Sequence, residues 1–370
     1  MNKDMNFDVT VIGGGPAGLA AALEAHKEGG RVLLIEREDR LGGILKQCIH
    51  DGFGLIRFGE KLSGPEYAQR FIDRFHEMGI EALTETFVTK IEAQQDAPPQ
   101  DSRCAPQDAP QDTPPHRFHL TASGRDGMII IEAAALVLAT GCRERTARQV
   151  FVHGSRPAGI FTAGTAQHLI NLQGQMPTKR CVILGSGDIG LIMARRLTLE
   201  GAEVVGVYEA KPQPSGLIRN IHQCLYDFDI PLHLSTTVTR VFGEHRVEEV
   251  EVCKVDETMQ PIPETEERIA CDSLILSVGL IPENELAESL GIQIDPATRG
   301  PLTDEEKMTS VPGVFSCGNA YRVYDLVDDV STDGELAGRA AAAWSLRSTR
   351  MDGGAGDCGA GIFAGKEAGV

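Results

Sequence analysis

The chain has 370 residues, of which 42% are hydrophobic and 24% charged, with 41 glycines and a formal net charge of −18 at pH 7. This length predicts two or three domains, and the negative charge opposes binding to nucleic acid. No apolar run approaches the ~18 residues that a membrane-spanning helix needs, so we expect a cytoplasmic protein with no integral membrane segment.

The first 36 residues contain one βαβ unit. Residues 7 to 36 read as an apolar strand, a glycine turn, an alanine-rich helix and a second strand that ends in an acid. The turn has the spacing G-x-G-x-x-G, which brings a pyrophosphate to a helix N-terminus, and the acid can accept hydrogen bonds from a ribose. The candidate residues of this first nucleotide site are Gly13, Gly15, Pro16, Ala17, Gly18, Glu36 and Arg37.

The stretch GGILKQCIHDGFG, residues 42 to 54, contains one of nine widely spaced cysteines, Cys48. No C-x-x-C exists in the sequence, which counts against a local zinc site, an iron–sulfur site or a short-range redox disulfide. We therefore predict no metal site and mostly reduced, structural thiols.

Two segments are unlike the rest of the chain. Residues 94 to 116 are rich in proline, glutamine and aspartate, and the composition predicts a disordered insertion between two strands. Residues 348 to 370 are predicted to form a flexible tail.

A second βαβ unit covers residues 180 to 209 and repeats the plan of the first. Its candidate residues are Gly185, Ser186, Gly187, Asp188, Ile189, Gly190 and Glu209. A carboxylate at Glu209 would repel a 2′-phosphate, which favours NAD(H) over NADP(H), although Glu209 could also be only a solvated strand end. Asp188 would oppose a phosphate unless its side chain points away.

Three further strands end in turns of small residues, in ALVLATGCRER (135 to 145), SLILSVGLIPEN (273 to 284) and VPGVFSCGNA (311 to 320). A helix is predicted to begin near Ser331 and Thr332, because Thr332 and Glu335 have capping-box spacing. Its N-terminus could face a negatively charged group.

The order GGGPAG, Glu36, ATG, GSGDIG, Glu209, SVGLIPEN and GVFSCGN resembles the flavin- and pyridine-nucleotide-dependent oxidoreductases with two dinucleotide-binding domains, the pyridine nucleotide-disulfide oxidoreductase-like class. The resemblance covers residues 7 to 345. It implies an α/β fold with two Rossmann-like domains, an NAD domain (149–279) being inserted into an FAD domain (1–148 and 280–347).

The resemblance also implies cofactor roles for individual residues. The first turn would hold FAD, the second would hold NAD(H), and the Gly318–Asn319 turn would bind the flavin, with Asn319 in place of the aspartate usual in the class. Further candidates are Gly42, Gly43, Val88, Ala139, Thr140 and Gly141 for FAD, and Gly279 for NAD.

Several stretches, among them GGILKQCIHDGFGL and CGNAYRVYDLVDDVS, are similar to the NAD-linked flavoprotein subunit found beside anaerobic glycerol-3-phosphate dehydrogenases. This similarity implies an electron-transfer subunit that moves hydride between nicotinamide and flavin. Its partners would be a second flavoprotein dehydrogenase subunit together with a small cysteine-rich protein.

Two other functions stay open at this point. The chain could be a self-contained NADH oxidase or disulfide reductase that uses Cys48, or a non-catalytic scaffold stabilised by FAD. Cys48 itself could form a flavin wall, tune the flavin or act as a reactive thiol. Asp325, Asp328 and Asp329 could be a solvated face, a subunit contact or neighbours of the flavin.

Overall fold

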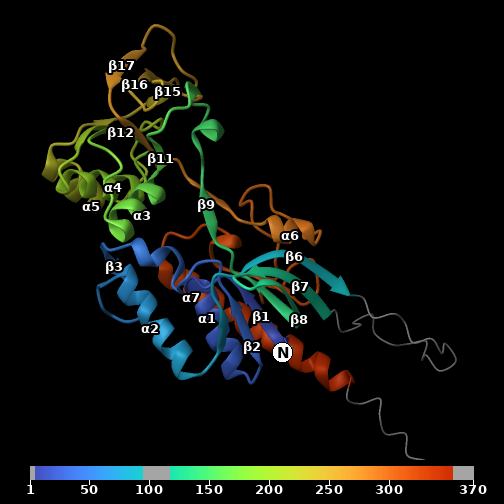
Figure 1. Cartoon of the computed structure of the whole chain (residues 1–370). Helices are drawn as coiled ribbons and strands as arrows, with labels where there is room; N and C mark the ends of the chain where they lie inside the picture. The colour runs from blue at the N-terminus through green and yellow to red at the C-terminus, as the bar shows by residue number, and fades with distance from the viewer. Residues whose placement is uncertain (1–4, 95–116, 353–370) are drawn as a thin grey trace, which may run out of the picture.

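The computed structural model describes residues 5–94 and 117–352 (Figure 1). Residues 95–116 of the predicted insertion and 353–370 of the predicted tail lie outside the described residues. The described chain forms two lobes, joined by the antiparallel ribbon of β9 (Cys142–Glu144) and β19 (Leu280–Pro282). We call them the first lobe, which holds both ends of the described chain, and the second lobe, which holds residues 145–279. No helix of the described part is long and apolar enough to span a membrane.

The first lobe is built on a seven-stranded sheet of order β5-β2-β1-β8-β7-β6, with β20 paired to β8. The strands are β1 (Asn6–Ile12), β2 (Val32–Ile35), β5 (Glu81–Leu83), β6 (Phe87–Gln94), β7 (Arg117–Gly124), β8 (Gly127–Leu138) and β20 (Val314–Ser316). β1 pairs in parallel with β2 and β8, whereas β6, β7 and β8 are antiparallel. A small hairpin of β3 (Asp51–Phe53) and β4 (Leu62–Ser63) lies apart from this sheet.

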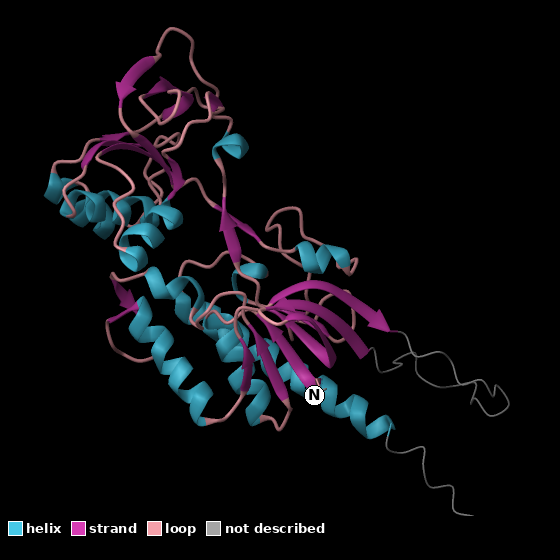
Figure 2. Cartoon of the chain, viewed as in Figure 1, coloured by secondary structure: helices cyan, strands magenta, loops and turns pink. Residues whose placement is uncertain are grey.

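Helices cover one face of this sheet (Figure 2). They are α1 (Pro16–Lys27), α2 (Gly64–Glu77) and α7 (Val327–Asp352), with the short helices η1 (Gly43–Gln47) and η4 (Gly318–Ala320) nearby. The helix α6 (Glu285–Ser289) packs in the core on the other face. α1 and α7 cross closely, since a methyl group on Gly334 would lie 2.2 Å from the Ala17 carbonyl oxygen. The first and last parts of the chain therefore share one core.

The second lobe contains a parallel five-stranded sheet of order β11-β18-β12-β13-β14 and a four-stranded sheet of order β10-β15-β16-β17. The first sheet is formed by β11 (Ile160–Thr162), β12 (Arg180–Leu184), β13 (Glu203–Tyr208), β14 (Leu232–His233) and β18 (Ser273–Leu276). The second is formed by β10 (His153–Gly154), β15 (Thr236–Phe242), β16 (Glu249–Lys254) and β17 (Glu267–Ala270). The helices are α3 (Ala163–Gln173), α4 (Asp188–Leu199), α5 (Ile218–Cys224), η2 (Ala147–Val150) and η3 (Tyr226–Phe228).

The predicted fold class is confirmed. Both predicted βαβ units are present, as β1–α1–β2 and β12–α4–β13, and in each the two strands pair in parallel. The second unit lies in the second lobe, and the second lobe separates two parts of the first lobe in the sequence. This is the arrangement expected for one Rossmann-like domain inserted into another.

The predicted start of the last helix is wrong. α7 begins at Val327, with Asp328 and Asp329 in its first turn. Carboxylates are stabilising at this position because they interact favourably with the positive end of the helix dipole. Thr332 lies inside the helix, and its hydroxyl donates to the Asp328 carbonyl oxygen, four residues earlier (2.9 Å). The helix also reaches Asp352, past residue 348 where the tail was predicted, and the chain then meets the glycine pair at 353 and 354.

Candidate functional site

Both glycine turns open into a single cavity between the two lobes. The cavity has a volume of about 1530 Å³ and is lined by Gly13 and Gly15 from the first turn and by Gly187 and Asp188 from the second. Sites for one small ligand usually enclose roughly 300–1,000 Å³, so this cavity is large enough for more than one.

The first turn owes its shape to Gly13 and Gly18. Gly13 has a φ of 108°, and a methyl group on it would lie 2.3 Å from the carbonyl oxygen of Ala139. A methyl group on Gly18 would lie 1.8 Å from the Gly13 carbonyl oxygen. Both positions therefore need glycine for the fold itself, before any ligand binds.

The second turn repeats this arrangement. Gly185 has a φ of 100°, and a methyl group on it would lie 2.0 Å from the Ser277 carbonyl oxygen. A methyl group on Gly190 would lie 2.6 Å from the Gly185 carbonyl oxygen. The absence of a side chain at both positions therefore allows α4 to lie close to the turn, as α1 does in the first lobe.

The middle glycines differ from the others because the protein itself leaves room beside them. A methyl group on Gly15 would approach only the Gly43 Cα (3.9 Å), and one on Gly187 only the Ser277 Oγ (3.8 Å). Their φ angles, −77° and −65°, suit any residue. Each lies at the N-cap of a helix, where backbone amides favour an anion. The space kept at these two glycines fits a pyrophosphate, so the residues present fit the two dinucleotides.

The two acids that end the second strand of each unit bind their turns in the same way. Glu36 accepts hydrogen bonds from the amides of Gly14 (2.7 Å) and Glu38 (2.8 Å). Glu209 accepts from the amides of Ser186 (3.0 Å) and Lys211 (3.0 Å). Each carboxylate therefore braces its glycine turn as well as ending its strand.

Glu209 differs from Glu36 in its access to the cavity. Both residues are buried, but Glu36 lines the cavity, whereas Glu209 is not among the lining residues. Its Oε2 also accepts from the hydroxyl groups of Ser186 (2.6 Å) and Ser215 (3.3 Å). Residues that follow β13 thus cover the second acid.

Asp188 points away from the second turn. Its Oδ1 accepts from the Leu217 amide (2.9 Å) and from Asn220 Nδ2 (2.7 Å). The carboxylate therefore satisfies donors at the start of α5, which leaves the amides of α4 available to a phosphate.

Cys48 is a buried thiol with protein partners. Its Sγ donates to the Ile44 carbonyl oxygen (3.3 Å) and lies 3.8 Å from Gln167 Oε1. Burial raises the pKa of the Cys48 thiol to about 12, so the reactive thiolate is scarce at neutral pH. The seven cysteines of the described residues are all free, and three of them, Cys48, Cys142 and Cys224, line the cavity.

The Gly318–Asn319 turn is held by Asp333, a buried acid with an ion-pair partner, which the sequence did not reveal. Asp333 on α7 accepts from the Gly318 amide (2.7 Å) and pairs with Lys307 (2.6 Å). Asn319 lines the cavity, and its Oδ1 accepts from the Tyr324 amide (3.1 Å). A carboxylate thus supports the turn from α7, although Asn319 itself carries no charge.

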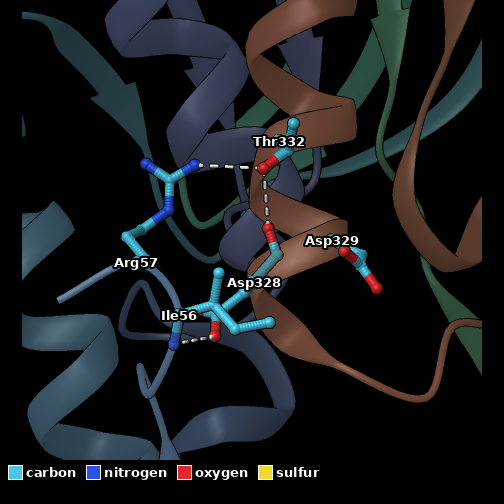
Figure 3. Close-up of a pocket in the computed structure, with 5 residues that line it drawn as sticks. All are labelled: Ile56, Arg57, Asp328, Asp329 and Thr332. Atoms are coloured by element: carbon cyan, nitrogen blue, oxygen red, sulfur yellow. Dashed lines mark hydrogen bonds between the residues drawn. The ribbon is translucent and has the colours of Figure 1, made fainter. Parts of the chain in front are cut away.

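A smaller cavity of about 280 Å³ lies beside the start of α7 and is lined by Ile56, Arg57, Asp328, Asp329 and Thr332 (Figure 3). The Ile56 amide donates to Asp328 Oδ2 (3.2 Å). Asp328 is buried and lines the large cavity as well as the small one. Asp325 is exposed and lines the large cavity, and Asp329 is exposed and lines only the small one. Of the three acids, only Asp328 is thus a buried neighbour of the large cavity.

Most of the predicted site residues meet in the large cavity. The lining residues among them are Gly13, Gly15, Pro16, Ala17, Glu36, Arg37, Gly43, Cys48, Val88, Ala139, Thr140, Gly141, Gly187, Asp188, Ile189, Gly279 and Asn319. The predicted residues that do not line the cavity are Gly18, Gly42, Gly185, Ser186, Gly190, Glu209 and Gly318. The described residues contain no cluster of three or more His, Cys, Asp or Glu side chains that could hold a metal ion.

Sequence reasoning missed a set of polar residues that the fold brings to the cavity. They are Gln47, Gln167, Asn171, Arg195, Arg196 and Arg219. None belongs to a glycine turn or follows a strand at fixed spacing, so no local pattern marks them. Their place is set by how the two lobes meet.

Comparison with known proteins identifies the family of the chain. The model of the family "pyridine nucleotide-disulphide oxidoreductase" matches residues 110–334, and that of "FAD dependent oxidoreductase" matches residues 8–122. Over 359 residues, 93% of this chain, it is 24% identical to one subunit of the opine oxidase of Agrobacterium tumefaciens (strain Ach5). It is 28% identical over 344 residues to hydrogen cyanide synthase subunit HcnB of Pseudomonas protegens, covering 85% of this chain. It spans 66% of the length of each of these relatives.

Among solved structures, thioredoxin reductase of Lactococcus lactis in its FR conformation shares the fold. The TM-score is 0.71 at 20% identity, over 92% of this chain and 99% of that one. The glycine turns, the cavity they share and the family match over more than half of the sequence agree. The chain belongs to the pyridine nucleotide-disulphide oxidoreductase family.

Proposed function

We propose that this chain is an electron-transfer subunit that moves hydride between NAD(H) and FAD and exchanges electrons with a separate dehydrogenase. The observation that carries the proposal is the cavity shared by both turns, whose three lining cysteines are free and include the buried, high-pKa Cys48. Reduction of a disulfide substrate would need a pair of neighbouring thiols, and Cys48, Cys142 and Cys224 have no close sequence spacing such as C-x-x-C. The electrons of the flavin would therefore leave to another protein.

The partner in this proposal is a substrate-oxidising flavoprotein, such as a dehydrogenase of glycerol 3-phosphate, with a small cysteine-rich protein as a further candidate. Support comes from the names of the opine oxidase and hydrogen cyanide synthase relatives, which are subunits. Co-purification of the intact complex would identify the partner.

We assign FAD to residues 1–148 and 280–347 and NAD(H) to residues 149–279. Gly15 and the amides of α1 would hold the FAD pyrophosphate, Glu36 would accept from its ribose, and Asn319 would border the flavin side. Gly187 and the amides of α4 would hold the pyrophosphate of NAD(H). When bound, FAD supplies the hydride-transfer chemistry, and the protein supplies binding and orientation.

The proposal is tested by mixing the FAD-loaded protein with NADH under anaerobic conditions and following the visible flavin absorbance. We expect NADH to bleach the flavin, and the Cys48→Ala variant to do so at the wild-type rate because the buried thiol takes no part. Failure of NADH to bleach the flavin, in the isolated chain and in its complex, would favour the scaffold. Rapid turnover of NADH with oxygen that is lost in Cys48→Ala would favour the self-contained oxidase.

A second experiment tests the preference for NADH over NADPH. Glu209 is a buried carboxylate braced against the second turn, and a 2′-phosphate nearby would be repelled. We expect the double variant Glu209→Ser/Ala210→Arg to shift the ratio of the half-saturating concentrations of the two cofactors by about tenfold towards NADPH, equivalent to about 1.4 kcal/mol. Ala210→Arg alone is the control, and a wild-type protein that prefers NADPH would contradict the assignment.

A further inference from the structure

The two lobes are fastened to each other by side chains at the cavity as well as by the β9–β19 ribbon. η1 carries Gln47 and directly precedes Cys48 in the first lobe, and α3 lies on the side of the second lobe that faces the first (Figure 1). Gln47 Nε2 donates to the Gly164 carbonyl oxygen (2.9 Å) and to Gln167 Oε1 (3.1 Å), both on α3. Both Gln47 and Gln167 are buried.

The same contact is reinforced from the next turn of α3. Asn171 Nδ2 donates to the backbone carbonyl oxygen of Gln47 (2.8 Å), and Asn171 Oδ1 accepts from Arg196 Nε on α4 (3.1 Å). α4 begins at the second glycine turn. An unbroken chain of hydrogen bonds thus links η1, beside the first nucleotide site, to the helix that begins at the second.

The ribbon meets this network at the start of α3. Glu144 on β9 accepts from the Gly164 amide with both carboxylate oxygens (2.9 and 3.0 Å). Gly164 is therefore held at its amide by the ribbon and at its carbonyl by Gln47. Close approach of the lobes is also seen at Gly52, where a methyl group would lie 3.6 Å from Arg219 Nη2.

We propose that η1 and α3 form an inter-lobe latch, in which Gln47, Gln167 and Asn171 are positioning residues that align the two nucleotide sites for hydride transfer. Hydride transfer depends steeply on alignment, because displacements near 1 Å can lower a rate by about 10²-fold. Buried amides suit this role, because directional hydrogen bonds between them fix both the distance and the orientation of η1 relative to α3. The latch rests on the proposed hydride transfer between NAD(H) and FAD within the chain. It does not depend on which partner protein exchanges electrons with the flavin.

The test compares Gln47→Ala and Gln167→Ala with the wild-type FAD-loaded protein. With saturating NADH, we expect the limiting rate of flavin reduction to fall by about 10- to 100-fold. FAD content should stay unchanged, and the half-saturating NADH concentration should stay within about twofold, because the glycine turns are untouched. The double variant should lose no more than Gln47→Ala alone, since that substitution already removes the Gln47–Gln167 bond together with the bond to the Gly164 carbonyl oxygen.

Hydrogen exchange gives a readout that is independent of activity. Either single substitution should raise amide exchange in both contacting segments, residues 43–48 and 163–171, although they lie in different lobes. Gln173→Ala is the matched control, because Gln173 is exposed on the same helix and bonds His168 (3.0 Å) on that helix, and it should behave as wild type.

Three results would overturn the latch. One is an unchanged limiting rate in both glutamine variants, and another is faster exchange confined to the segment that carries the substitution. The third comes from Asn171→Ala, which keeps both glutamines and removes the bond to the Gln47 carbonyl. If Asn171→Ala reduces its flavin at the wild-type rate, the latch does not position the lobes.

Discussion

Replacing Gly15 with alanine should release FAD from a chain that stays folded. The added methyl group would meet no protein atom closer than the Gly43 Cα at 3.9 Å, and the φ of −77° suits alanine. It would instead occupy the space left for the pyrophosphate at the start of α1. Crowding of this kind costs about 1–3 kcal/mol, so we expect the dissociation constant of FAD to rise by roughly 5- to 150-fold.

The measurement is flavin absorbance per chain after gel filtration, together with thermal unfolding of the FAD-free protein. Gly18→Ala provides the contrast, because its methyl group would lie 1.8 Å from the Gly13 carbonyl oxygen. That variant should lower the stability of the FAD-free protein, whereas Gly15→Ala should leave it unchanged. Normal FAD affinity in Gly15→Ala would show that the pyrophosphate does not lie beside this glycine.

Replacing Gly187 with alanine should weaken the binding of NADH while FAD stays bound. The methyl group would again meet only a distant atom, Ser277 Oγ at 3.8 Å, so the second lobe should fold normally. The expected loss is about 1–3 kcal/mol of binding free energy, which raises the half-saturating NADH concentration by roughly 5- to 150-fold. Anaerobic stopped-flow mixing over a range of NADH concentrations measures it.

Two controls give this result its meaning. Dithionite should still reduce the flavin of Gly187→Ala completely, which shows that FAD remains bound and reactive. Gly185→Ala should destabilise the second lobe, since its methyl group would lie 2.0 Å from the Ser277 carbonyl oxygen at a φ of 100°. An unchanged half-saturating concentration in Gly187→Ala would place NADH elsewhere.

The features that the sequence predicted well are those fixed by short spacing. A glycine turn, the helix after it and the acid at the end of the next strand lie within about one βαβ unit, so local order dictates their geometry. The prediction of both units followed from that order, whereas the inserted arrangement was implied by the resemblance to a known family. The common bracing of Glu36 and Glu209 against their turns is a consequence of the same repeat.

The features it missed depend on pairs distant in the chain. Gln47 and Gln167 meet across 120 positions, and neither carries a motif. Asp333 and Lys307 meet only after α7 has packed beside the Gly318 turn. The start of α7 was misplaced because Thr332 and Glu335 have the spacing of a cap, yet Glu335 binds Arg57 on a different segment (2.7 Å). Tertiary contacts decided each of these cases.

The crossing of α1 and α7 has a consequence for how the protein is made. The second lobe is continuous in sequence and can complete its core while the chain is still emerging. The first lobe must wait, because α1 packs against α7 and β8 pairs with β20, segments separated by the whole second lobe. Forming such long-range contacts slows folding. The nucleotide site of the first glycine turn, which comes first in the sequence, is therefore assembled last.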